Sequence, residues 1–151
     1  MSEKVIPQSM IDMLGYTEDD VKGLTRKQRE ILCVGEDMYN YKMVAEVVSA
    51  SNCGYRPKIG DRYVFAAAGT IIPEECTWPI CVWALAPMMP FFYMFYDRIR
   101  KGMDPNDMWT ENIKCLDVGT RCGGFGEVLF KIKYETLNEE EKMAVLQSLV
   151  R

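Results

Sequence analysis

The chain has 151 residues, enough for one domain with a substantial core. Its 18 basic and 22 acidic side chains give a net charge of −4, so we expect no nucleic-acid partner. It contains no histidine, which excludes Ser-His-Asp and Cys-His catalysis, zinc sites with imidazole ligands and haem with an axial histidine.

The first forty residues predict a helical extension. Residues 7–14 form a short apolar-periodic helix that ends at Gly15. Thr17 provides a hydroxyl cap for a second helix that ends at Gly23, and residues 25–34 predict a third. This N-terminus lacks the apolar core of a signal peptide, so we expect a cytoplasmic protein with reduced cysteines.

The middle of the chain, residues 41–135, predicts an α+β core with a small antiparallel sheet of about four strands. The first strand is rich in β-branched side chains, and the second alternates aromatic residues on one face. The predicted strands cover residues 41–50, 62–67, 113–118 and 127–135. Extension, core and a C-terminal helix at residues 136–151 together predict a single domain over residues 1–151.

A glycine-rich loop, residues 119–126, joins the last two predicted strands. Such loops can cradle phosphate groups, but phosphate-binding loops run from a strand into a helix. Because this loop leads into a strand, we predict a hairpin or a bulge. Asp117 lies just before the loop. The sequence is compatible with either a structural or a functional role for this residue.

The C-terminal residues 137–150 predict an amphipathic helix. Asn138 is placed to cap it, and the three glutamates that follow favour its positive end. Its apolar stripe would consist of Met143, Leu146, Leu149 and Val150. We expect this stripe to pack either on the sheet or on a partner chain.

The most unusual feature is residues 76–96, which carry no formal charge. About 20 such residues can span a bilayer, and the acidic and basic flanks have a matching asymmetry. Pro87 and Pro90 argue against a membrane span, because each removes a backbone donor and no partner span satisfies the freed carbonyls. We therefore predict that this segment belongs to a water-soluble domain.

A kinked pair of helices accounts for the segment. Thr77 or Trp78 would cap the first helix, with Pro79 in its first turn and Pro87 at its end. The second helix would run from about residue 88 to residue 101.

A helix that is apolar on every side is expected to be buried all round, and one layer of sheet cannot cover it. Part of its surface should therefore contact another subunit or a ligand. A methionine-rich core is the alternative. The candidate contact residues are Trp83, Met88, Met89, Phe92, Tyr93 and Tyr96.

The six cysteines include no Cys-x-x-Cys pair, so the usual zinc-knuckle and ferredoxin spacings are absent. Cys53, Cys76 and Cys122 lie in predicted loops, where they could converge on a zinc ion or an iron–sulfur cluster. Buried thiols without a ligand are the alternative, and no cofactor is favoured.

Cys81 is the best candidate for a nucleophile. It would lie in the first turn of the apolar helix, where exposed backbone amides favour the thiolate. Cys76 fits this role less well, because Glu74 and Glu75 oppose a thiolate. Asp97 could act as an acid or a base if it were buried, and an ion pair with a neighbouring arginine is the alternative.

Several short motifs follow one another in an order that resembles a known family. They are Cys53, Lys58-Ile59-Gly60-Asp61, Pro79-x-Cys81-x-Trp83-Ala84, Cys115-x-Asp117 and Val128-Leu129-Phe130. The pattern, over about residues 41–135, is similar to that of a family of small, conserved bacterial and archaeal proteins. The resemblance implies a compact domain with recurring cysteines, and no particular activity, cofactor or substrate.

Three functional hypotheses follow from these features. The first is a small protein that acts by association, as a homo-oligomer or as an accessory subunit of a metabolic enzyme. The second is a cysteine-dependent enzyme or small-molecule-binding protein with a pocket near Cys81, Trp83 and Asp97. The third is an all-thiolate zinc or iron–sulfur protein.

Overall fold

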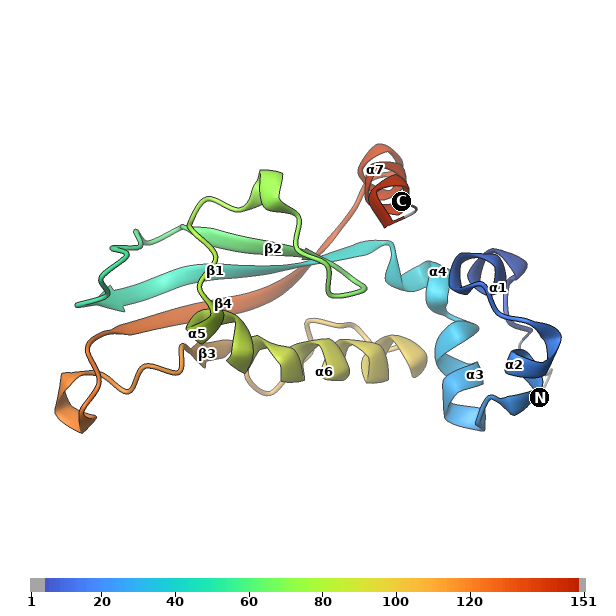
Figure 1. Cartoon of the computed structure of the whole chain (residues 1–151), viewed down its shortest axis with the longest axis horizontal. Coiled ribbons are helices and arrows are strands. Elements are labelled where there is room, and N and C mark those ends of the chain that lie inside the picture. The colour runs from blue at the N-terminus through green and yellow to red at the C-terminus, as the bar shows by residue number, and fades with distance from the viewer. Residues whose placement is uncertain (1–4, 150–151) are drawn as a thin grey trace.

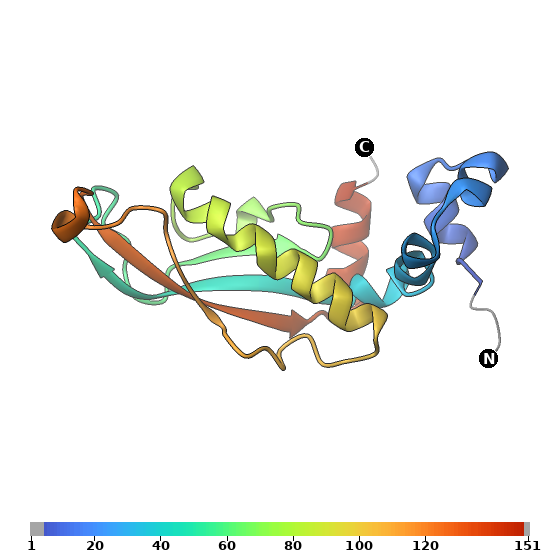
Figure 2. The same ribbon diagram turned by 90° about the horizontal axis from the view of Figure 1, so that it is seen from below.

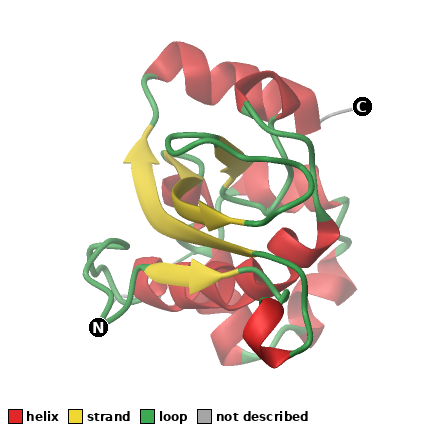
Figure 3. Ribbon diagram, turned by 90° about the vertical axis from the view of Figure 1, so that its left-hand side faces the viewer, coloured by secondary structure: helices red, strands yellow, loops and turns green. Residues whose placement is uncertain are grey.

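Four strands form one antiparallel sheet in the order β2-β1-β4-β3. The computed structural model describes residues 5–149, with side chains described as far as residue 147. β1 pairs with β2 on one side and with β4 on the other, and the short β3 completes the sheet beside β4. The strands twist strongly when viewed along the sheet (Figure 3). The strand bounds are Tyr41–Ser51 for β1, Arg62–Ala66 for β2, Asn112–Lys114 for β3 and Glu127–Thr136 for β4.

One face of the sheet is covered by a continuous helical segment (Figures 1 and 2). This segment consists of α5 (Val82–Leu85), the 3-10 turn η2 (Ala86–Met88) and α6 (Met89–Arg100). Its inward side chains meet the alternating apolar residues of the strands, and Phe95 stacks on Tyr134 with ring centroids 4.6 Å apart. The predicted fold class, a small antiparallel sheet packed on an apolar helical segment, is confirmed.

The predicted start of this segment is wrong. Residues 76–81 follow the 3-10 turn η1 (Pro73–Glu75) and contain no helix, and α5 begins only at Val82. Pro79 therefore precedes the helix. The α-helical geometry of α5 does end shortly before Pro87, at Leu85, as predicted, and Pro87 lies in the first turn of η2, where a missing backbone donor is tolerated.

The outer edge of β2 is covered by the chain that follows it. The Thr70 carbonyl accepts a hydrogen bond from the Ala66 amide at 2.8 Å. The Val64 carbonyl accepts one from the Ile72 amide at 2.9 Å. The amide of Val64 donates to the sulfur of Cys76 at 3.4 Å, and the thiol of Cys76 lies 3.3 Å from the Ile72 carbonyl oxygen. Cys76 thus has a structural role in closing a sheet edge.

The opposite face of the sheet carries charged side chains on β1 and β4. Lys133 is 2.8 Å from Glu135 and 3.7 Å from Glu46 across the strand pair. Lys42 is buried at one end of this face, where it pairs with Glu75 at 2.6 Å. Val44 and Val64 are nevertheless buried on this same face, so charged side chains occupy only part of it.

The N-terminal extension forms four helices, which lie together at one end of the molecule (Figure 1). Thr17 caps α2 as predicted, and both Thr17 and Thr25 make capping boxes. The fourth helix was not predicted, and its first residue, Gly35, packs so closely on Met10 that a Cβ there would lie 2.5 Å from the Met10 methyl group. The bounds are Gln8–Leu14 for α1, Glu18–Gly23 for α2, Arg26–Leu32 for α3 and Gly35–Met38 for α4.

The C-terminal helix α7 (Glu139–Leu149) packs beside this extension. Asn138 caps it, accepting a bond from the Glu141 amide at 2.9 Å, as predicted. Leu146 packs against a second, smaller apolar cluster formed by Ile6, Met10 and Tyr39, which the sequence did not indicate. Met143 is exposed, and the predicted stripe positions Leu149 and Val150 lie outside the described side chains.

None of the helices described between residues 5 and 149 is both long enough and apolar enough to cross a membrane.

Candidate functional site

A pocket of about 160 Å³ lies at the end of the molecule away from the N-terminal helices. Four separate segments meet there: the loop after β1, the chain leading into α5, the chain after β3 and the start of β4. Three cysteines line it, namely Cys53, Cys81 and Cys115, and all three are half-buried. We call it the cysteine pocket. The six cysteines all lie in the described part of the chain, and none is in a disulfide.

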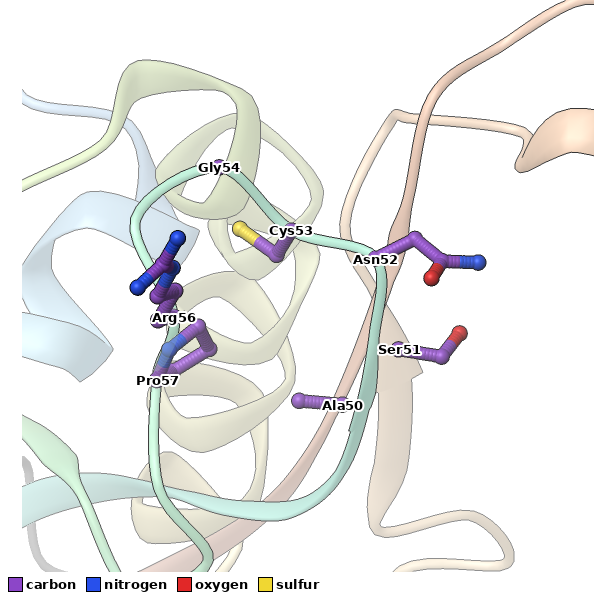
Figure 4. A pocket seen from close by; sticks show the side chains of 7 residues that line it. All are labelled: Ala50, Ser51, Asn52, Cys53, Gly54, Arg56 and Pro57. Atoms are coloured by element: carbon purple, nitrogen blue, oxygen red, sulfur yellow. The ribbon is translucent and has the colours of Figure 1, made fainter.

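Cys53 is held by a tight loop between β1 and β2. Figure 4 shows its sulfur directed toward the inner side of the curved loop, with Asn52 pointing away. Asn52 and Arg56 both have positive φ angles, 53° and 46°, which a glycine would adopt more readily. The loop also packs on β4 so closely that a Cβ on Gly126 would lie 2.7 Å from the Asn52 backbone. Long-range packing therefore fixes the position of Cys53.

Cys81 is the residue that precedes α5, with an extended backbone (φ −117°, ψ 119°). The prediction that it lies in the first helical turn is wrong, and its thiol makes no capping hydrogen bond. Its amide instead donates to the Tyr63 hydroxyl oxygen at 3.1 Å, and that hydroxyl donates to the Pro79 carbonyl at 2.8 Å. Burial raises the pKa of Tyr63, so the hydroxyl stays neutral and orders the chain before Cys81.

Cys115 follows β3 and still bonds to the sheet, donating its amide to the Val128 carbonyl at 2.9 Å. The next amide, that of Leu116, turns away and donates to the Trp83 carbonyl at 2.9 Å. This bond takes the chain off the sheet, so the strand predicted at residues 113–118 is shorter than expected. The same bond ties Cys115 and the start of α5 together at the pocket.

Asp117 organises the glycine-rich loop. Its carboxylate accepts bonds from the amides of Gly119 and Phe125 at 3.0 Å and of Gly126 at 3.1 Å. These amides, first that of Gly119 and then that of Gly126, lower the pKa of Asp117. The loop joins the antiparallel pair β3 and β4, as predicted. These three amides are therefore already bound to a carboxylate and do not point at an empty anion site.

Aromatic side chains form much of the remaining wall. Trp78 is buried, stacks on Tyr63 at 5.4 Å and donates its indole N–H to the Tyr55 carbonyl at 3.3 Å. Tyr55, Trp83 and Phe125 line the pocket and are largely exposed. The pocket thus has an apolar inner wall and an aromatic outer wall.

The three cysteines predicted as metal ligands do not share this site. Cys53 lines the pocket, Cys76 lies at the edge of β2, and Cys122 is exposed in the 3-10 turn η3 (Thr120–Cys122). No cluster of three or more cysteine, aspartate or glutamate side chains suited to a metal ion occurs among residues 5–149. The sequence could not show this, because the spacing of loops says little about where their side chains point.

Asp97 is not part of the pocket lining. It lies in the last turns of α6, 52% exposed, and pairs with Arg100 and Lys101 at 2.6 Å each. These two cations, Arg100 first, lower the pKa of Asp97 to about 2. Asp97 is therefore not buried, as a role in acid or base catalysis would require. The ion pair with a neighbouring arginine, which was predicted as the alternative, is present.

The predicted contact residues divide between the two sides of the helical segment. Met88 and Phe92 face the sheet and are buried in the core, so they are not available to a partner. Tyr96 is half-buried and donates its hydroxyl to the Ala67 carbonyl at 3.1 Å. The exposed side, which we call the outer face, consists of Val82, Trp83, Ala86, Met89, Pro90 and Tyr93.

Sequence reasoning missed several lining residues, among them Cys115, Tyr55, Trp78 and Phe125. A signal was nevertheless available, because residues of the motif pattern set out above converge on this pocket. These are Cys53, Cys81, Trp83, Ala84, Cys115, Asp117 and Val128.

Comparisons with known proteins found no matching family model, no matching curated protein and no matching solved structure. The family resemblance therefore rests on the residue pattern alone.

Proposed function

We propose that this protein acts by association, through the outer face of α5, η2 and α6. The single observation behind this proposal is that large apolar side chains lie in water along a helical segment whose other side forms the core. Val82, Trp83, Met89 and Tyr93 are 70%, 59%, 53% and 70% exposed. They leave on the order of 500 Å² of largely apolar surface in water, and patches of that size commonly mark interaction sites.

A second copy of the chain is the partner that this face suits best. The outer face carries no formal charge from Val82 to Tyr93, so two copies can approach without like-charge repulsion. A face of this kind is also compatible with two-fold pairing, in which each copy presents the same residues. Association with a larger enzyme subunit is the heterologous form of the same proposal, and the cytoplasm is the proposed compartment.

Sedimentation equilibrium of the purified chain tests the proposal. We expect a dimer at micromolar concentrations, and we expect the double variant Met89→Lys, Tyr93→Lys to be monomeric because it places charge at the centre of the face. The matched control is Trp109→Lys, which changes an aromatic residue that is 92% exposed in a distant loop. A monomer at ~100 µM, or a double variant that associates like the parent, would contradict self-association.

Thiol chemistry at Cys81 is a second candidate, favoured by its position in the cysteine pocket. The rate of alkylation by iodoacetamide at neutral pH, followed residue by residue by mass spectrometry, tests it. A nucleophilic Cys81 should react faster than both free cysteine and the exposed Cys122. If Cys81 reacts no faster than free cysteine, this candidate fails.

A further inference from the structure

We propose that the cysteine pocket binds a small organic cation of the quaternary-ammonium type. This inference concerns a different surface from the association proposal, since only Trp83 belongs to both the pocket and the outer face. It also does not require Cys81 to react.

The aromatic lining is the first observation. Tyr55, Trp78, Trp83 and Phe125 come from four different positions along the chain and line one cavity. The faces of aromatic rings carry negative charge density that attracts cations, and indole is the strongest of these rings. Cages of several aromatic side chains are the usual protein site for quaternary ammonium groups.

The charge of the lining is the second observation. Asp117 and Glu127 line the pocket, and no lysine or arginine does. Glu127 is compensated by Lys114, whose ammonium nitrogen lies 2.5 Å from its carboxylate. Asp117 forms no salt bridge among residues 5–149, and Lys114 acts on it only from a longer distance. One lysine therefore faces two carboxylates, and the remaining negative charge favours a cation over an anion in the cavity.

The hydrogen bonds of Asp117 narrow the class of cation. Its two oxygens already accept three backbone amides, those of Gly119, Phe125 and Gly126. The thiols that complete the lining are weak hydrogen-bond acceptors. A primary ammonium ion would bring three donors into a pocket that offers few free acceptors, whereas a methylated ammonium ion needs none.

The volume of the pocket limits the size of the ligand. A cavity of about 150 Å³ accommodates a benzene-sized molecule, and this pocket is about 160 Å³. A cation of roughly five to seven non-hydrogen atoms, such as tetramethylammonium or choline, therefore matches the cavity.

Titration calorimetry with choline, tetramethylammonium and 3,3-dimethyl-1-butanol tests the proposal on the full chain. The alcohol is the uncharged isostere of choline, so it separates cation recognition from simple apolar filling. We expect both cations to bind and the alcohol to bind at least about tenfold more weakly. Equal binding of choline and the alcohol, or no binding of either cation at ~10 mM, would overturn the proposal.

Two variants identify the aromatic wall as the binding surface. Trp83→Leu removes a ring that is 59% exposed, and we expect it to weaken choline binding about tenfold. Trp109→Leu is the control, because this tryptophan is 92% exposed and does not line the pocket. Equal loss in both variants would show non-specific surface binding and overturn the proposal.

The cysteines report the location independently. Saturating choline should slow the alkylation of Cys53, Cys81 and Cys115, which line the pocket, and leave that of Cys122 unchanged. Protection of Cys122 to the same extent would place the ligand elsewhere. The same measurement on the Met89→Lys, Tyr93→Lys variant separates the two proposals. Choline should still protect the three pocket cysteines in this variant, even though its association through the outer face is lost.

Discussion

The two sides of the helical segment formed by α5, η2 and α6 have similar side chains in opposite environments. The inner side places Met88, Phe91 and Phe95 in the core, whereas the outer side places Met89 and Tyr93 in water. The apolar character of a residue in this segment therefore does not predict whether that residue faces the core or water. The difference teaches that a two-layer fold covers a helix on one side only, so the second apolar side stays exposed.

The largest expected effect lies on the inner side. Phe95→Ala should lower the free energy of unfolding by about 3–5 kcal/mol, because Phe95 is fully buried and stacks on Tyr134. Chemical denaturation measures this loss. Phe95→Leu, which retains most of the volume, should cost much less, and equal losses in the two variants would contradict a packing origin.

A polar contact on the same side should contribute less. The Tyr134 hydroxyl is buried and donates to the Phe91 carbonyl of α6 at 2.8 Å, and burial raises the pKa of Tyr134. Tyr134→Phe should therefore lower the free energy of unfolding by about 1 kcal/mol in denaturant titrations. Tyr96→Phe, which loses a half-buried bond to Ala67, should have a smaller effect; the reverse order would contradict this ranking.

The outer side should contribute almost nothing to the stability of a single chain. Tyr93→Ser should change the free energy of unfolding by less than about 0.5 kcal/mol at concentrations where the chain is monomeric, because the residue is 70% exposed and the helix propensities are similar. If the outer face is an interface, the parent chain should gain stability with concentration and this variant should not. A loss of about 2 kcal/mol or more in the monomer would show that Tyr93 belongs to the core.

The smallest effect on the free energy of unfolding is expected at Asp97, at the end of the outer side. Arg100 and Lys101 lower the pKa of Asp97 from 3.8 to about 2, so the folded chain binds this proton less readily than the unfolded chain. The resulting stabilisation is complete above the unfolded pKa and is lost as the pH falls from about 4 to about 2.

Thermal unfolding at pH 7 and at several pH values from about 4 to about 2 tests this expectation. Asp97→Asn should be slightly less stable than the parent at pH 7, and the difference should shrink toward pH 2. Because the carboxylate is 52% exposed, salt at ~1 M should also reduce the difference. A difference that is constant with pH and salt would rule out the ion pair as its cause.

The sequence predicted the local features of the fold well. Thr17 and Asn138 cap helices as expected, because a cap depends only on groups within about three residues of each other. The strands β1 and β4 were also predicted within a residue or two, since the β-branched composition of β1 and the alternating burial of β4 are local patterns.

The candidate site was only partly predictable. Cys81 and Trp83 do line one pocket, but Asp97 does not, and Cys53 joins them there rather than Cys76 and Cys122. The pocket depends on contacts between distant segments, such as the Leu116 amide with the Trp83 carbonyl and Gly126 with the Asn52 backbone. No spacing along the chain encodes such contacts.

By itself the sequence determined the class of fold, the capped helices and the presence of an uncharged apolar segment with no histidine chemistry. Tertiary structure alone decided where that segment becomes helical, which of its sides meets water and which cysteines meet at one pocket. The physical reason is the range of the interactions involved. Caps and strand alternation depend on neighbours a few residues away, whereas the burial of a helix side and the walls of a pocket depend on packing between segments far apart in the chain.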